Sequence, residues 1–122
     1  MRFARRVFLF AAIYGFLALV PQYFLIDKNG RDSPPAITHM EYYFGFVGVA
    51  LAWQVAFLVI ARDPARYRLL MLPAIAEKVL FGIPVAILFT LGRVGAPMLV
   101  AGIVDLGLGL LFLVAFTRTP KA

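Results

Sequence analysis

The chain has 122 residues, of which 63% are hydrophobic, and this composition excludes an ordinary soluble domain, where roughly 45 to 50% is usual. The formal charge of +6 comes from basic residues in short clusters between apolar segments, a pattern that indicates membrane topology and argues against a nucleic-acid partner. The lack of cysteine excludes thiol chemistry, and the length allows one domain, residues 1–122, embedded in a lipid bilayer.

The first predicted membrane-spanning helix covers residues 7–26. These twenty residues follow a basic start, Arg2, Arg5 and Arg6, and match the roughly 20 residues that cross about 30 Å of hydrocarbon. A cleaved signal peptide is the alternative interpretation, but residues 20–24 offer no small residues of the kind found at a cleavage site. We therefore expect an uncleaved helix.

Residues 27–35 are the clearly polar stretch of the chain and are predicted to form a loop. Thr38 and Glu41 fit a capping box at the start of the second predicted helix, residues 42–61. A metal site at His39 and Glu41 is the alternative use of these side chains. One histidine with one carboxylate is an incomplete ligand set, so we predict no metal site.

The second predicted helix carries a stripe of small residues and two large polar or aromatic side chains. Gly48, Ala52 and Ala56 recur at every fourth position, which predicts a face that packs closely against another helix. Trp53 and Gln54 lie well inside the span. Because lipid offers no hydrogen-bond partner, we expect the Gln54 amide to bond to a group on another helix.

The third predicted helix, residues 64–91, holds two adjacent charges. Asp63 as N-cap and Pro64 at the first helical position predict a tight connection, so the second and third helices are expected to pack as a hairpin. Glu77 and Lys78 interrupt the apolar sequence. A charge at the centre of a span costs about 2.5 to 3.5 kcal/mol, which predicts a protein-lined interior around both residues.

The fourth predicted helix covers residues 97–116 and begins with a proline. Six of its residues, spaced by three and four, share one face, and this face holds the only acid of the helix. We expect the face to point into the bundle. Its residues are Met98, Gly102, Asp105, Gly109, Phe112 and Phe116.

The basic residues predict which side of the membrane each end faces. Eight lie at the end that holds both termini and three at the other, so the positive-inside rule predicts that both termini are cytoplasmic. The eight are Arg2, Arg5, Arg6, Arg62, Arg66, Arg68, Arg118 and Lys121, and the three are Lys28, Arg31 and Arg93.

Polar side chains lie at similar heights on all four predicted helices. With a rise of about 1.5 Å per residue, they lie roughly 8 to 16 Å from the cytoplasmic ends. One interpretation is that this polar layer only sets the register of the helices. The other is that it lines a cavity for a lipophilic ligand, with Asp105 as a candidate proton carrier or hydrogen-bond donor. The candidate residues are Tyr14, Trp53, Gln54, Glu77, Lys78 and Asp105.

The pairing within this layer is also predicted from helix geometry. Helical side chains lean toward their own N-terminus, so Lys78 and Asp105, on oppositely running helices, are expected to diverge. Lys78 is then expected to reach the headgroups, and Glu77, about 100° around the helix from it, is not expected to pair with it. Glu77 and Asp105 would bond to Gln54, Tyr14 or water.

Three short motifs accompany the four-helix layout. They are Asp63-Pro64 with Arg66 and Arg68, the pair Glu77-Lys78, and the run from Asp105-Leu106 to Leu111-Phe112. With them, the chain resembles small bacterial integral membrane proteins of the DoxX-like kind. The resemblance implies the bacterial inner membrane and an accessory role beside a membrane-bound oxidoreductase more than a stand-alone enzyme, without a cofactor of its own.

Two further groups of four-helix membrane proteins are similar to the chain in part. The bundle of sterol isomerases and sigma-2 proteins is similar in enclosing a lipophilic ligand among acidic and aromatic residues, parts that Trp53, Glu77 and Asp105 could take by analogy. Small multidrug exporters are similar in length. Their acid lies in the first helix, where this chain has none. We therefore expect an all-α bundle that holds a lipophilic ligand or docks a membrane partner or a second copy, with an isomerase-like enzyme and a proton-coupled transporter as alternatives.

Overall fold

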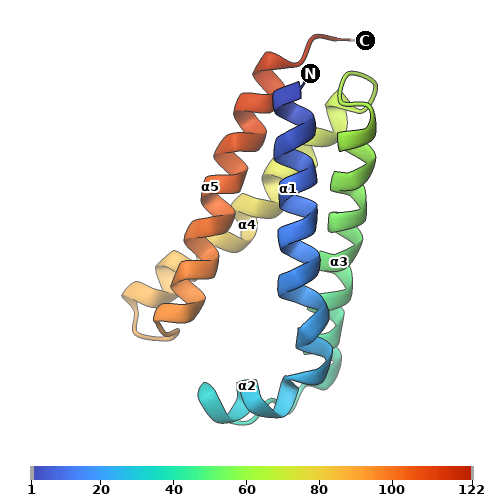
Figure 1. Ribbon diagram of the computed structural model, residues 1–122. Coiled ribbons are helices and arrows are strands. Elements are labelled where there is room, and N and C mark those ends of the chain that lie inside the picture. Colours follow the sequence, from blue (N-terminus) through green and yellow to red (C-terminus); the bar gives the residue numbers. More distant parts are fainter. Residues whose placement is uncertain (1, 122) are drawn as a thin grey trace.

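The computed structural model describes residues 2–121 and is all-α in that range, as predicted (Figure 1). Four spans of 23 residues each are long and apolar enough to cross a membrane. A short helix and a loop segment connect the first two spans. The elements are α1 (Arg2–Leu19) continued by the 3₁₀ helix η1 (Val20–Phe24), α2 (Ile26–Asp32), α3 (Met40–Arg62), the 3₁₀ helix η2 (Arg68–Leu70) leading into α4 (Met71–Thr90), and α5 (Ala96–Arg118).

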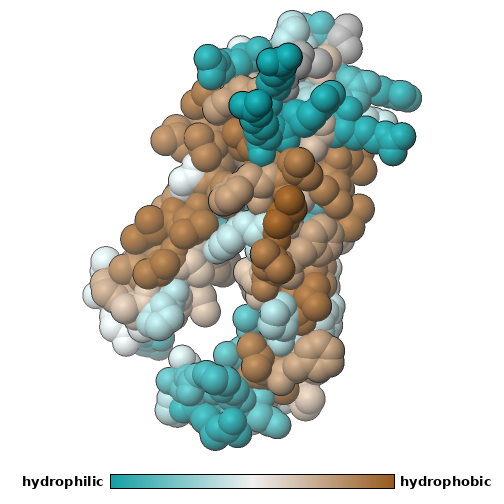
Figure 2. Space-filling model, in the orientation of Figure 1, coloured by the Kyte–Doolittle hydropathy of each residue, from teal (hydrophilic) through white to brown (hydrophobic). Residues whose placement is uncertain are grey.

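The outer surface of the spans is apolar, which suits contact with lipid. Large side chains such as Leu17, Leu80 and Leu110 are well exposed on the outside of the bundle. Figure 2 shows this brown band between two hydrophilic ends. The start of α1, the α3–α4 connection and the end of α5 lie together at one end, which we call the basic end (Figures 1 and 2). The opposite end, which carries α2, is called the α2 end.

The four spans pack as two pairs. α1 lies along α3, and α4 lies along α5, whereas α3 and α4 touch only weakly (Figure 1). The predicted hairpin of the second and third spans is therefore wrong. The connection itself explains the difference. Asp63 is the C-cap of α3, and the next span begins only at Arg68, after a turn over residues 64–67 that gives α4 room to lean away.

An aromatic cluster joins the two pairs near the basic end. The rings of Phe8 on α1 and Phe112 on α5 are stacked with centroids 4.1 Å apart. Phe57 of α3 meets Phe112 edge-on at 5.0 Å. All three side chains are fully buried. The cluster closes this half of the bundle, and the two pairs diverge toward the α2 end.

The interface between α4 and α5 depends on glycine. A Cβ added at Gly82 would lie 2.5 Å from Leu106 Cγ and 2.9 Å from the Gly102 carbonyl oxygen, so the two helices are closer than alanine allows. Gly102, Gly109 and Phe112 are buried here, as predicted for the inward face of α5. Met98, at the α2 end of that face, is exposed instead.

The small-residue stripe of α3 does not form the predicted packing face. Gly48 and Ala56 are half-buried and Ala52 is exposed, while the buried face of α3 runs through other residues. The small residues that let α1 and α3 approach each other lie on α1. They are Ala4, Ala11, Ala12 and Gly15, all buried.

The capping box predicted for the second span is wrong as well. His39 is the N-cap of α3, and its side chain bonds to no amide of the first turn. Because the helix begins at Met40, Thr38 precedes the cap and cannot cover the free amides. The Glu41 carboxylate lies 3.0 Å from Nδ1 of His39, and both side chains are exposed.

The polar stretch predicted as a loop contains the short helix α2. Its charges suit the helix dipole, with Asp27 in the first turn and Arg31 in the last. Lys28 and Asp32, four residues apart, form an exposed ion pair. A Cβ on Gly30 would lie 3.1 Å from Cα of Ala36, so α2 packs directly against the segment that follows it.

The α4–α5 contact generates the first prediction. Gly82→Ala should lower the free energy of unfolding by about 1 to 3 kcal/mol, because the new methyl group would overlap Leu106 and the Gly102 carbonyl. Gly107→Ala is the matched control, since Gly107 also lies in a helix but has open space around it, and it should not destabilise the protein. Unfolding by dodecyl sulfate in mixed micelles measures both. An equal loss of stability in the two variants would show that the close approach of α4 and α5 at Gly82 does not stabilise the protein.

Candidate functional site

A cavity of about 610 Å³ lies between the two helix pairs. Residues of α1, α3, α4 and α5 form its walls, and residues of α2 and the following segment line its mouth. In Figure 2 the molecule is hollowed between the lower part of α5 and the teal residues of α2. The walls are largely apolar, and Phe46 and Phe81 stack across the side between α3 and α4 with centroids 5.9 Å apart. The aromatic cluster lies beyond the inner end of the cavity.

Charged side chains of α4 and α5 meet at this inner end. Nζ of Lys78 lies 3.4 Å from Oδ1 of Asp105 and donates a hydrogen bond to it, and it lies 3.6 Å from Oε2 of Glu77. The Lys78 side chain is only 3% exposed, and the two carboxylates are 15% and 18% exposed. A buried ammonium between two carboxylates is therefore the electrostatic centre of the site.

This cluster corrects three predictions about Lys78. The lysine does not diverge from Asp105, it does not reach the headgroups, and it contacts Glu77 although the two are adjacent on the helix. Two features of the packing explain the change. A Cβ at Gly109 would lie 3.2 Å from the Lys78 Cβ, so α5 passes close to this residue. Phe57, 5.2 Å from Nζ, occupies the route toward the basic end.

Gln54 of α3 lies at the same inner end and is 1% exposed. Its Nε2 donates a 2.8 Å hydrogen bond to the Ala50 carbonyl of its own helix, so the predicted bond to another helix is wrong. Its Oε1 has no hydrogen-bond partner among the described residues. A Cβ on Gly15 would lie 1.9 Å from this oxygen, so α1 carries glycine where the amide needs room.

Of the two remaining residues of the predicted polar layer, one lines the cavity and the other does not. Tyr14 of α1 is half-buried and lines the cavity. Trp53 does not line it; its ring packs beside Phe57, with centroids 6.4 Å apart, against the hydrophobic core. The structure therefore brings five of the six candidate residues to one cavity. They are Tyr14, Gln54, Glu77, Lys78 and Asp105.

A second polar group at the mouth of the cavity escaped the sequence reasoning. Asn29 of α2 donates from Nδ2 to Oε1 of Gln22 at 2.7 Å and to the Tyr43 hydroxyl at 2.9 Å. That hydroxyl donates to the Gln22 carbonyl at 2.7 Å, so three elements are tied together. Gln22 inside an otherwise apolar span was the available signal. Asn29 looked like a turn residue, which hid its role.

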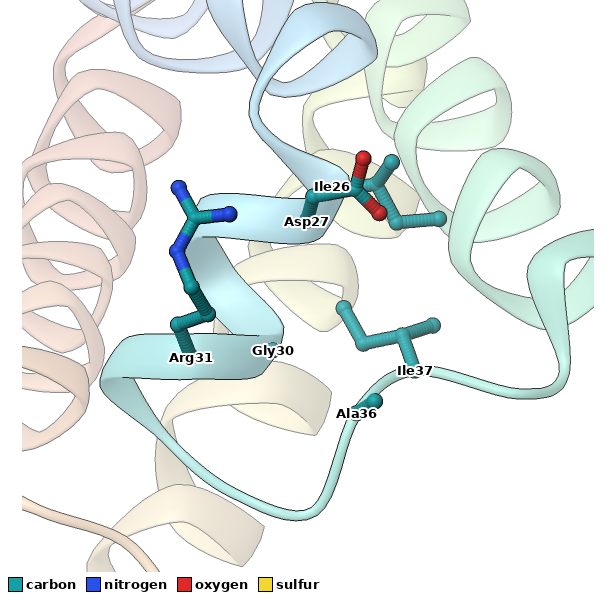
Figure 3. A pocket seen from close by; sticks show the side chains of 6 residues that line it. All are labelled: Ile26, Asp27, Gly30, Arg31, Ala36 and Ile37. Carbon is teal, nitrogen blue, oxygen red and sulfur yellow. The ribbon is translucent and has the colours of Figure 1, made fainter.

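A smaller pocket of about 250 Å³ lies between α2 and the segment after it. Figure 3 shows that the Asp27 and Arg31 side chains extend away from each other and do not converge on this space. Gly30, Ala36 and Ile37 supply most of the remaining lining. We assign no function to this pocket. Within residues 2–121, no three histidine, aspartate or glutamate side chains gather at a metal-binding spacing.

The geometry of the larger cavity suits a molecule with an apolar body and a polar head. Sites for small molecules typically enclose about 300 to 1,000 Å³ and combine apolar walls with a few placed polar groups. Here the polar groups gather at the inner end and the apolar walls lead away from it. Comparisons of the chain with protein-family models, curated proteins and solved structures gave no match. This cavity is therefore the feature of the molecule that points to a function.

The charge cluster generates the second prediction. Lys78→Met should lower the free energy of unfolding by about 3 kcal/mol, because two carboxylates would lose the one cation beside them. Asp105→Asn should cost clearly less, since Lys78 still faces Glu77. Dodecyl sulfate titration of both variants in mixed micelles measures the difference. A larger loss in Asp105→Asn would contradict the assignment of Lys78 as the centre of the cluster.

Proposed function

We propose that this protein is a small multi-pass membrane protein that binds a lipophilic or amphipathic small molecule between its two helix pairs. The observation that carries the proposal is the cavity of about 610 Å³ with a buried polar inner end. Its walls come from four spans that are long and apolar enough to cross a membrane. The polar layer then serves as the part of the site that orients the ligand.

The bonding of the polar layer supports this role over one that only sets helix register. A layer that served register alone would bond across the helices, as polar groups in membrane bundles do. Within the polar layer, the only hydrogen bond between helices among the described residues joins Lys78 to Asp105. Oε1 of Gln54 has no hydrogen-bond partner in the described chain, and Oε2 of Glu77 is held only by the ion pair with Lys78 at 3.6 Å. A buried acceptor without a partner is costly, and a ligand that donates to Gln54 would explain why this residue is kept.

The cavity opens toward the α2 end, and this sets the proposed route of entry. Eight basic residues predict that the opposite end faces the cytoplasm, and the DoxX-like resemblance implies that the membrane is a bacterial inner membrane. The ligand would then enter from the outer leaflet or the outer surface, past the bonds that join Gln22, Asn29 and Tyr43.

A matched pair of variants tests ligand binding and is the third prediction. Ala101 lines the cavity, so Ala101→Phe should fill it and remove any copurifying small molecule. Ala76 lies exposed on the outside of α4, and Ala76→Phe should keep that molecule. Native mass spectrometry of protein released gently from its own membrane compares the adducts. A molecule retained equally by both variants would be bound to the outer surface and would contradict the proposal.

Docking of a membrane partner is a second candidate, and the exposed Ala52 in the small-residue stripe of α3 favours it. Gly48, Ala52 and Ala56 allow close helix approach, yet no helix of this chain covers Ala52 in the described structure. The resemblance to DoxX-like proteins implies an accessory role beside an oxidoreductase. In that role, the partner would bind at this face of α3.

The fourth prediction tests this docking face. Ala52→Leu should dissociate a co-purifying protein while leaving the fold intact, because a larger side chain on an exposed position blocks only an outside helix. Leu80→Ala, on the outer face of α4, is the control and should retain the complex. Gel filtration in mild detergent followed by identification of the bound protein measures both. A complex retained by Ala52→Leu would remove this face from the interaction.

A further inference from the structure

We infer that the head group of the ligand is a hydrogen-bond-donating cation, such as a protonated amine, and not a carboxylic acid. This inference rests on the proposed function, because it names the ligand class of the same cavity. It follows from three features: the unpaired oxygen of Gln54, the balance of charge at the inner end and the aromatic side chains that line the cavity.

In the described chain, the buried side-chain polar atoms at the inner end that form no hydrogen bond are acceptors. The Gln54 amide nitrogen already donates to the Ala50 carbonyl, so the oxygen, buried beside Gly15, is the atom of this side chain that lacks a partner. Rotating the amide would break that 2.8 Å bond and place two acceptor oxygens together. Oε2 of Glu77 forms no hydrogen bond within the described residues, but it lies 3.6 Å from the Lys78 ammonium and is ion-paired with it. The Gln54 oxygen is therefore the acceptor that needs a donor, which a ligand N–H group reaching it would supply.

The charged residues at the inner end determine which sign of charge the ligand should carry. Two acids, Glu77 and Asp105, and one base, Lys78, are the charged residues that line the cavity within the described chain. Counted as ionised, they leave one negative charge in excess. The ammonium of Lys78 lies within 3.6 Å of both carboxylates and is shared between them. A ligand carboxylate would add a third negative charge beside this single cation, whereas an ammonium would balance the site.

The aromatic walls favour the same ligand. Tyr14, which precedes Gly15 on α1, lines the inner end, and the face of an aromatic ring attracts a desolvated cation. Phe46 and Phe81 stack on each other farther toward the mouth and add apolar wall. The alkyl body of an amine would lie among the apolar walls that lead toward the mouth. An amphipathic amine therefore matches the cavity at both of its ends.

Four probes with the same alkyl chain test the inference: dodecylamine, dodecanol, dodecanoic acid and dodecyltrimethylammonium. Each is titrated against the purified full chain in a neutral detergent, and native mass spectrometry measures the bound fraction. We expect dodecylamine to bind at least about tenfold tighter than the alcohol or the acid, as one charge-assisted hydrogen bond provides. The trimethylammonium probe has the charge but no N–H group, so it should bind more weakly than the amine.

Two variants assign the selectivity to residues. Gln54→Leu removes a free acceptor and should bring the affinity for dodecylamine toward that for the trimethylammonium probe. Asp105→Asn removes the excess negative charge and should reduce the difference in affinity between dodecylamine and dodecanol. Ala76→Phe, on the lipid-facing side of α4, should leave all four affinities unchanged.

The outcomes separate the two proposals. Equal or tighter binding of dodecanoic acid would overturn the inference while leaving a ligand-binding cavity in place. Equal binding of dodecanol and dodecylamine would overturn the cationic part, because the site would then select donors regardless of charge. No saturable binding of any probe, or the same binding in Ala101→Phe, would overturn the proposed function together with the inference.

Discussion

The burial of one ammonium between two carboxylates is the constraint on which the structure depends. Lys78 is nearly inaccessible in a chain whose outer surface faces lipid, so its charge must be compensated by the protein itself. Asp105 provides that compensation only because α4 and α5 approach through Gly82, Gly102 and Gly109. The glycine contact and the ion cluster are therefore one feature of the fold, and the α4–α5 pair is its most closely packed part.

The separation of the bundle into two pairs turns this cluster into a site. Phe8, Phe57 and Phe112 join the pairs at the basic end and keep headgroups and water away from Lys78. Beyond the cluster the pairs diverge, and the space between them becomes a cavity with charge at its inner end. Had α3 and α4 packed closely, apolar side chains would have filled that space. The weak α3–α4 contact is thus what leaves room for a ligand.

The incomplete hydrogen bonding of polar groups at the inner end of the cavity connects the stability of the protein with its proposed function. A buried acceptor without a partner costs about 1 to 3 kcal/mol, and Gln54 holds one at the inner end in the described chain, beside the Glu77 carboxylate that shares the Lys78 ammonium. Gly15 on α1 preserves the space beside Gln54 that an alanine would close. A protein under selection for stability alone would replace these groups by apolar ones. Their presence is the physical basis for the proposed ligand and for its donor character.

The sequence by itself determined the four spans, the inward face of α5 and the height of the polar residues, because length, hydropathy and helical spacing are local properties. It could not determine which helices pair, and it placed the packing stripe of α3 on Ala52, which faces outward. Lipid is as apolar as the protein core, so hydropathy does not distinguish buried from lipid-facing positions in a span. The directions of Lys78 and Gln54 were decided only by tertiary structure, because a flexible side chain turns to the partner that packing places within reach.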